Sequence, residues 1–346
     1  MKHFFHTILV LLVTHVCFAQ QQYTFTNYTE EQGLASGTIL GMFKDNTGFI
    51  WLLSEEGISR FDGYNFKVFR HNPDDSTSIP NNSCALGLQL ANGDMWFQLF
   101  QELRLYEPEK LSFTSQFPYR DSGQFIFYSF ILKNDSNALY IVSKDKIIRV
   151  KNSDCSYFPL PVKTGANRNI TASDSAGVIM TSIWGKIFAL HAGAKQYERV
   201  SVADRSGERD TTVFDIFYTA AENTFTAISR KHLYRFSREQ NKFIPALDLQ
   251  QLPSLGDRLI DPKARGVVGQ PFFNNYYFAF SSDGNLYKLD MKTGEEKIIH
   301  LNTKIPEEEI KDKTVNITVI DKNARLPDGQ GILWIGTPGM GLFRFN

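Results

Sequence analysis

The sequence has little of what marks nucleic-acid-binding or membrane-spanning proteins. Lysine and arginine total 37, as do aspartate and glutamate, so the chain lacks the excess positive charge of a nucleic-acid-binding face. After the first residues, no apolar run approaches the roughly 18 residues that a membrane span needs. No segment repeats apolar residues at helical spacing over several turns. Helix is therefore expected to be scarce.

The N-terminus has the pattern of a secretory signal peptide. Lys2 precedes the apolar run from Ile8 to Val13, and the small residue Ala19 provides a cleavage position. We predict a signal peptide over residues 1–19 and an exported, periplasmic location for residues 20–346. A lipoprotein anchored through Cys17 is disfavoured, because the residues before this cysteine lack the usual small side chain. An uncleaved anchor is disfavoured too, because the apolar run is too short to cross roughly 30 Å of hydrocarbon.

A repeat of strand, turn and strand organises the rest of the chain. Its clearest copy has Asp45, Gly48 and Trp51, followed by Gly57 and the apolar strand Ile58–Phe61. The large residue that ends the motif recurs every 40 to 56 residues, at Trp51, Trp96, Tyr140, Met180, Phe225, Phe278 and Trp334. Repeats of roughly 40 to 50 residues with strand content are typical of propeller blades. The sequence therefore predicts an all-β fold, a seven-bladed β-propeller.

Each blade is expected to contain four antiparallel strands joined by short turns. In blade one these are residues 38–43, 49–53, 58–61 and 66–69. Blade seven offers only three, at 315–320, 332–335 and 342–345, whereas the alternating segment 23–28 precedes blade one without a blade of its own. We predict that strand 23–28 becomes the fourth strand of blade seven and closes the ring, because this removes an exposed sheet edge.

The two cysteines outside the predicted signal peptide are expected to be free thiols. Cys84 falls in the innermost strand of blade two and Cys155 in the outermost strand of blade three. Three strand spacings alone amount to about 14 Å. A disulfide requires Cα atoms within about 7 Å, so the pair is too far apart.

These motifs resemble the two-component regulator propeller repeat. Gly331 to Thr337 and Gly339 to Phe345 match its tryptophan-isoleucine-glycine-threonine segment and its glycine-leucine segment with an aromatic residue and arginine. Asp45 to Phe61 matches nearly as well. The segment Phe25 to Tyr28, followed by Gly33 and Leu34, looks like the start of the extracytoplasmic sensor region of hybrid two-component systems in Bacteroidetes-type bacteria. The resemblance covers 23–346.

The resemblance implies a sensor module that binds a ligand, with no cofactor and no catalytic activity in this chain. Such sensors typically respond to carbohydrate breakdown products, so an oligosaccharide or a similar polar molecule is expected. They usually continue into a second propeller, an immunoglobulin-like domain, a membrane span and a histidine kinase, none of which is recognisable here. The implied partners are further sensor domains or a histidine kinase from a longer or neighbouring chain. A truncated gene product and a stand-alone binding protein both fit the sequence.

Ligands of propellers favour the face built from the second-to-third strand loops and the blade-to-blade crossings. The residues expected there are of mixed charge and include a tryptophan, which suits a polar ligand: Glu55, Glu56, Gln101, Glu102, Lys144, Asp145, Trp184, Arg230, Lys231 and Asp283. The long crossings 71–82 and 203–212 belong to the same face. Trp184 comes four residues after Met180, at the turn between two strands, where it either stacks on a ligand or covers the rim.

Two other classes of function stay open at the level of sequence. A secreted propeller enzyme, a glycosidase or lyase, would require several carboxylates or a tyrosine–histidine pair converging on one mouth. A protein-interaction propeller would require a flat, apolar loop face. Asp45, Asp174 and Asp321 are candidate carboxylates, but each is expected to begin a hairpin turn and to cap its backbone N–H groups. The histidines His71, His191, His232 and His300 lie in separate blades without metal-ligand spacing, so no metal site is expected.

Overall fold

The computed structural model of the protein describes most of the chain after residue 24. The described residues are 25–90, 92–100, 102–114, 131–133, 138–142, 146–151, 154–159, 170–173, 178–183, 186–191, 194–203, 207, 209–210, 213, 215–219, 223–229, 231–252, 254, 268–272, 276–280, 285–300, 316–321, 332–337 and 339–345. The predicted signal peptide, 1–19, lies outside them. Among the described residues, no helix is long and apolar enough to cross a membrane.

The fold is all-β, and its strands form four-stranded antiparallel units. The first two units are β2 (Gly41–Lys44), β3 (Ile50–Leu53), β4 (Ile58–Phe61) and β5 (Phe66–Phe69), then β6 (Cys84–Gln89), β7 (Met95–Leu99), β8 (Glu102–Glu107) and β9 (Ser112–Thr114). The third is β10 (Ile131–Lys133), β11 (Ala138–Val142), β12 (Lys146–Lys151) and β13 (Asp154–Pro159). The helices of the described chain are the short 3-10 turns η1 (Glu30–Gln32) and η3 (Leu249–Gln251).

The next two units are joined at their outer strands. One is β14 (Ile170–Ser173), β15 (Ile179–Ile183), β16 (Lys186–Leu190) and β17 (Glu198–Val202); the other is β18 (Asp215–Thr219), β19 (Thr224–Ile228), β20 (His232–Ser237) and β21 (Lys242–Asp248). β17 pairs in parallel with β21 through Ser201 and Val202, which makes one eight-stranded sheet. This pairing was not expected from the repeat, and it covers two outer edges that would otherwise stay unpaired.

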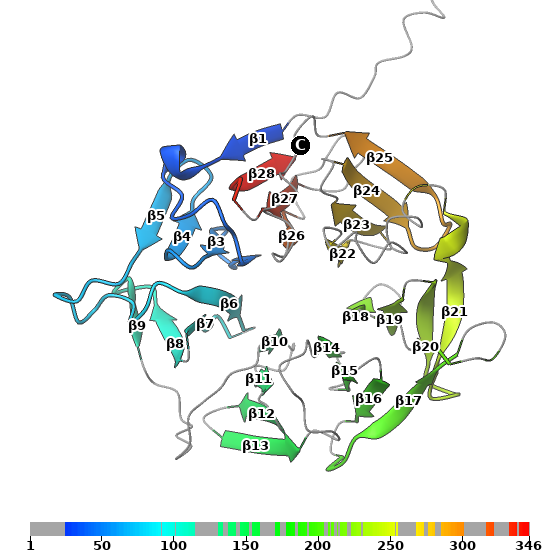
Figure 1. Cartoon of the computed structure of the whole chain (residues 1–346). Coiled ribbons are helices and arrows are strands. Elements are labelled where there is room, and N and C mark those ends of the chain that lie inside the picture. The colour runs from blue at the N-terminus through cyan, green and yellow to red at the C-terminus, as the bar shows by residue number, and fades with distance from the viewer. Residues whose placement is uncertain are drawn as a thin grey trace, which may run out of the picture.

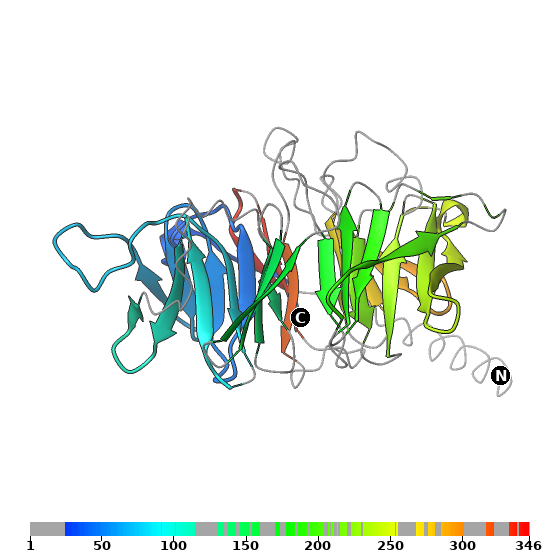
Figure 2. The same ribbon diagram turned by 90° about the horizontal axis from the view of Figure 1, so that it is seen from below.

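The sheets lie around a common centre (Figure 1). The last two are β22 (Val268–Phe272), β23 (Tyr276–Phe280), β24 (Asn285–Asp290) and β25 (Glu296–His300), then β26 (Asn316–Asp321), β27 (Ile332–Gly336) and β28 (Leu342–Phe345) with β1 (Phe25–Tyr28). Figure 2, turned by 90°, shows the strands side by side in one layer, with their ends on two opposite faces.

The predicted pairing of the N-terminal strand with the last strand is confirmed. β1 is antiparallel to β28, with Phe25 opposite Phe345 and Tyr28 opposite Leu342. The Tyr28 ring also packs against a ring of the first sheet and one of its own sheet, at centroid distances of 5.0 Å to Phe61 and 6.1 Å to Trp334. The N-terminal strand is therefore the outer strand of the last sheet, packs through Tyr28 on the first sheet, and joins the two ends of the described chain.

The spacing of the repeat motif has a direct cause in the first unit. The buried Asp45 carboxylate accepts hydrogen bonds from the backbone N–H groups of Thr47 (2.9 Å) and Phe49 (3.0 Å), and its other oxygen accepts one from Trp51 Nε1 (2.8 Å). Gly48 supplies the positive φ of 103° that the turn needs. One aspartate therefore closes the turn and holds the core tryptophan, which confirms the structural interpretation of Asp45.

The structure does not test the turn interpretation of the other two candidate aspartates. Asp174 lies outside the described residues. Asp321 is the last residue of β26 and pairs with Ile332. The residue that stands six positions before Trp334, as Asp45 stands before Trp51, is Asp328, which also lies outside the described residues. Trp334 Nε1 is buried and has no hydrogen-bond partner among the described residues.

The basic residue in the third strand packs across the sheet on the motif aromatic. Arg60 pairs with Trp51 between β3 and β4, and its guanidinium lies 4.3 Å from the Phe49 ring centroid and 5.8 Å from that of Trp51. Arg344 lies 5.8 Å from the Trp334 ring in the same way. Cation–π contacts of this kind explain why the repeat keeps a basic residue inside an apolar strand.

The strand positions of the cysteines are as predicted. Cys84 begins β6, the inner strand of its sheet, and Cys155 lies in β13, the outer strand of another sheet. Cys84 is a free thiol and fully buried. Burial raises the pKa of this thiol. The Cys155 side chain lies outside the described part of the structure.

The role of β1 in closing the fold generates the first test. We expect Tyr28→Ala to lower the free energy of unfolding of the whole domain by about 2–3 kcal/mol, because removal of a packed aromatic leaves a cavity between two sheets. Tyr64→Ala is the matched control, since this tyrosine is 90% exposed, and a change within about 0.5 kcal/mol is expected. Equilibrium urea unfolding followed by tryptophan fluorescence measures both. Equal stabilities of the two variants would contradict the closing role of β1.

The Asp45 turn generates a second test. We expect Asp45→Ala to lower the free energy of unfolding by about 2–3 kcal/mol, because the buried Trp51 N–H loses its acceptor. Asp62→Ala is the control: its carboxylate also accepts two backbone N–H groups, those of Tyr64 and Asn65, but in an exposed turn where water replaces it. We therefore expect Asp62→Ala to lower the free energy of unfolding less than Asp45→Ala does, and thermal unfolding of both variants measures the difference. A similar loss of stability in both variants would show that Asp45 stabilises only its turn and not the Trp51 indole.

Candidate functional site

One face of the molecule carries the loops between second and third strands. β3 and β4 are antiparallel, so the loop 54–57 between them lies at the strand ends opposite to the turn 62–65. We call the face with loop 54–57 the loop face. The β27–β28 loop, 337–341, and the crossing 29–40 lie beside it, since Ile39 N–H donates to Thr337 O. The crossing 70–83 also ends there, because Cys84 N–H donates to Ser54 O.

A serine hydroxyl shapes loop 54–57. Ser54 Oγ donates to Gly57 O at 2.7 Å and accepts from Glu56 N–H at 3.1 Å. Gly57 has a φ of 128°, and a Cβ there would lie 2.6 Å from Phe69 O, so no larger residue fits. This tight loop leaves the side chains of Glu55 and Glu56 exposed.

The same arrangement, a hydroxyl hydrogen-bonded to the backbone of its own loop, recurs in two other sheets. Thr337 Oγ1 donates to Gly341 O at 2.8 Å and accepts from Met340 N–H. Ser229 Oγ accepts from Lys231 N–H at 3.0 Å, and Lys231 is exposed. In these three loops a hydroxyl therefore holds the backbone, and the exposed Glu55, Glu56 and Lys231 lie next to it.

Four of the ten predicted site residues lie in the described part of the chain. Glu55, Glu56, Glu102 and Lys231 are all exposed, at the strand ends where they were expected. The other six lie outside the described residues: Gln101, Lys144, Asp145, Trp184, Arg230 and Asp283. The crossing 71–82 is described throughout, and the crossing 203–212 only in part.

A pocket of about 540 Å³ opens where the crossing 29–40 passes the first sheet. Its lining combines buried apolar residues with exposed charged ones: Glu30, Gly33, Leu34, Ala35, Ser36, Glu56, Val68 and Arg70. Glu56 is the predicted site residue among them. Glu30 and Arg70 were missed, because neither stands in a second-to-third strand loop.

The two charged side chains from outside the loop are held by backbone groups. Arg70 donates from Nε to Glu56 O (3.1 Å) and from Nη2 to Ala35 O (3.0 Å). Glu30 Oε1 accepts from Gly37 N–H at 2.7 Å. No carboxylate among the described residues forms an ion pair with Arg70. Its charge is therefore available to a bound molecule.

Phe100 is a third residue near the loop face that sequence reasoning missed. Its side chain is 61% exposed and its φ is 56°, an uncommon value for a bulky residue. Phe100 N–H donates to Ser83 O at 2.8 Å, which ties the β7–β8 loop to the crossing 70–83. The signal was present in the sequence: Phe100 follows Trp96 by four residues, as Trp184 follows Met180.

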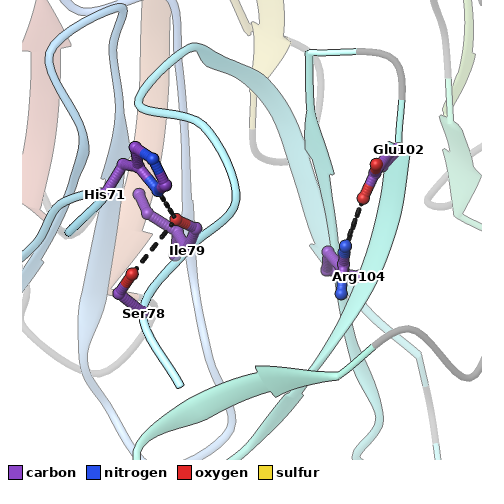
Figure 3. A network of polar contacts seen from close by, with 5 residues as sticks. All are labelled: His71, Ser78, Ile79, Glu102 and Arg104. Carbon is purple, nitrogen blue, oxygen red and sulfur yellow. Dashed lines mark hydrogen bonds and ion pairs between the residues drawn. The ribbon is translucent and has the colours of Figure 1, made fainter. Parts of the chain in front are cut away.

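Polar contacts order the crossing 70–83 and the start of β8 (Figure 3). His71 Nδ1 lies 2.8 Å from Ile79 O, which folds the crossing 70–83 back on itself. On β8, Arg104 Nε donates to Glu102 Oε2 at 2.9 Å. Glu102 is therefore partly engaged by its neighbour, whereas Glu56 forms no side-chain hydrogen bond or ion pair with any described residue.

A tyrosine–histidine pair of the kind an enzyme would need is present but buried. Tyr234 Oη donates to Asp210 Oδ2 at 2.7 Å and lies 3.4 Å from His232 Nδ1. Tyr234 is 0% exposed, Asp210 6% and His232 7%. The cluster ties the crossing that holds Asp210 to β20. In the described part of the chain, no group of three or more metal-ligating side chains comes together.

Comparisons with known proteins find similarity to parts of two-component system proteins. No protein-family model matches it. A stretch of 57 residues is 37% identical to histidine kinase P4 of Formosa agariphila, covering 16% of this chain and 4% of the kinase. The extracellular domain of a hybrid two-component system from B. thetaiotaomicron has a similar structure, with a TM-score of 0.64 and 16% identity. The predicted resemblance to such sensor regions is confirmed.

The likeness to solved structures defines an all-β, propeller-like fold. The match to the B. thetaiotaomicron domain covers 94% of this chain and 42% of that one. Virginiamycin B lyase from Staphylococcus aureus is also similar, with a TM-score of 0.66 and 10% identity over 94% of this chain and 99% of the enzyme. The chain thus spans less than half of the sensor domain and matches a small part of the kinase.

Proposed function

We propose that the chain is a seven-bladed β-propeller that works as an extracytoplasmic ligand-binding sensor module of a two-component signalling system. The observation that carries this proposal is the agreement of two comparisons, a sequence match to a histidine kinase and a structural likeness to the extracellular domain of a hybrid two-component system. The four-stranded units and the β1–β28 pairing support the seven-bladed ring.

The proposed ligand is an oligosaccharide or a similar polar molecule, bound at the loop face. Exposed side chains of both charges support this, among them Glu55, Glu56 and Lys231. Phe100 offers an exposed ring on which a sugar stacks. Trp184 has the same position in its repeat, so we assign it the same role. The remaining predicted residues complete the proposed face: Gln101, Glu102, Lys144, Asp145, Arg230 and Asp283.

A binding event on this module needs a partner that carries the signal onward. We propose further sensor domains or a histidine kinase, in a longer or neighbouring chain, and export to the periplasm through residues 1–19. The extracellular domain from B. thetaiotaomicron, of which this chain spans 42%, supports a receptor built from several such parts.

A propeller enzyme acting on glycans is the second candidate, because the likeness to a lyase extends over 99% of that enzyme. Catalysis requires reactive groups that a substrate reaches. Among the described residues, the pair that comes nearest to this requirement, Tyr234 and His232, is buried. Binding without turnover is therefore the function we favour for this chain.

The test is incubation of the purified protein with a panel of neutral oligosaccharides. Calorimetric titration measures binding, and chromatography of the mixtures detects products. We expect binding without cleavage. Phe100→Ala and Trp184→Ala should each weaken binding about fivefold or more, because a stacked aromatic contributes about 1 kcal/mol.

Tyr64→Ala is the control for the aromatic variants, since Tyr64 is an exposed aromatic in the turn at the opposite strand ends. Its affinity should equal that of the parent protein. Specific cleavage that survives stringent purification would overturn the sensor assignment in favour of an enzyme. If neither Phe100→Ala nor Trp184→Ala weakens binding, the ligand does not bind at this face.

A further inference from the structure

The pocket beside crossing 29–40 lies at the seam where the ring is closed. The crossing begins directly after β1 and is held from both sides. Gly37 O accepts from Gly339 N–H (3.0 Å) and Gly341 N–H (2.8 Å) of the last sheet. Ala35 O accepts from Arg70 of the first sheet. A molecule in the pocket therefore contacts the crossing and the first sheet together.

The charged groups around the pocket restrict what binds there. Glu30 and Glu56 provide carboxylates, which only accept hydrogen bonds, and Arg70 provides a guanidinium, which only donates them. Arg70 donates from Nε and Nη2 to backbone carbonyls, and Nη1 keeps its N–H groups for a ligand. An anionic ligand would face two carboxylates, and a cationic ligand would face the guanidinium.

A hydroxyl group satisfies both kinds of partner, because it donates to a carboxylate and accepts from a guanidinium. The Ser36 side chain adds a further hydroxyl to the lining, and the buried Leu34 and Ala35 offer apolar surface to C–H groups. The volume of about 540 Å³ lies within the range of roughly 300–1,000 Å³ typical of ligand pockets.

We propose that this pocket is a binding subsite for an uncharged unit with several neighbouring hydroxyl groups. The inference rests on the proposed function and deepens it, since it places one part of the polar ligand at the closing seam. Phe100 does not line the pocket. Binding of a single small unit should therefore depend on Glu56 and Arg70 and be independent of stacking on Phe100.

The test uses neutral hexoses as probes, with glucuronate and glucosamine as anionic and cationic counterparts. Saturation-transfer NMR at millimolar sugar should detect binding of at least one neutral hexose and weaker binding of both charged sugars. Hydrogen exchange should slow in the peptides that contain residues 29–38 and 54–57. Glu56→Ala should weaken hexose binding at least fivefold without loss of folding, because its exposed side chain bonds to no described residue.

Glu31→Ala is the matched control, because Glu31 is an exposed carboxylate beside the pocket and does not line it. Its hexose affinity should equal that of the parent protein. Oligosaccharide binding that is lost in Phe100→Ala and intact in Glu56→Ala would overturn the subsite and leave the proposed function standing. Absence of binding by hexoses and oligosaccharides alike would overturn both.

Discussion

The pairing of β1 with β28 is the constraint on which the rest of the molecule depends. A sheet of three strands would leave an unpaired edge at the last repeat, and β1 covers that edge with residues from the start of the described chain. The crossing 29–40 must then run from the last sheet to the first, and Tyr28 packs where they meet. The pocket of the loop face exists because this crossing passes over the first sheet.

In the first repeat, the same few side chains stabilise both the turn and the core. Asp45 holds its own turn and the indole of Trp51, while Arg60 packs on the same aromatic cluster from the neighbouring strand. The Met180 side chain has no N–H group and therefore needs no hydrogen-bond acceptor. The indole N–H of Trp334 is buried and does need one.

The candidate site differs in kind from the core of the repeat. Glu56, Lys231 and Phe100 are exposed in loops whose backbones are already held by hydroxyl groups or neighbouring carbonyls. Their side chains do not support the fold, and a ligand therefore meets them without disturbing it. The buried Tyr234–Asp210 bond is the opposite case, in which polar groups hold a crossing in place and lie out of reach.

The sequence by itself determined the strands, the turns and the closure by residues 23–28, because each rests on local spacing or on a count of strands per repeat. It also placed Glu56 at the loop face, since a loop position follows from the repeat. Only the tertiary structure shows that Glu30 and Arg70 line the same pocket as Glu56. The pairing of β17 with β21 is also known only from the tertiary structure. These contacts join residues that are separated in the chain. They depend on the path of the connecting segments, which is set by how whole sheets pack and cannot be predicted from local sequence patterns.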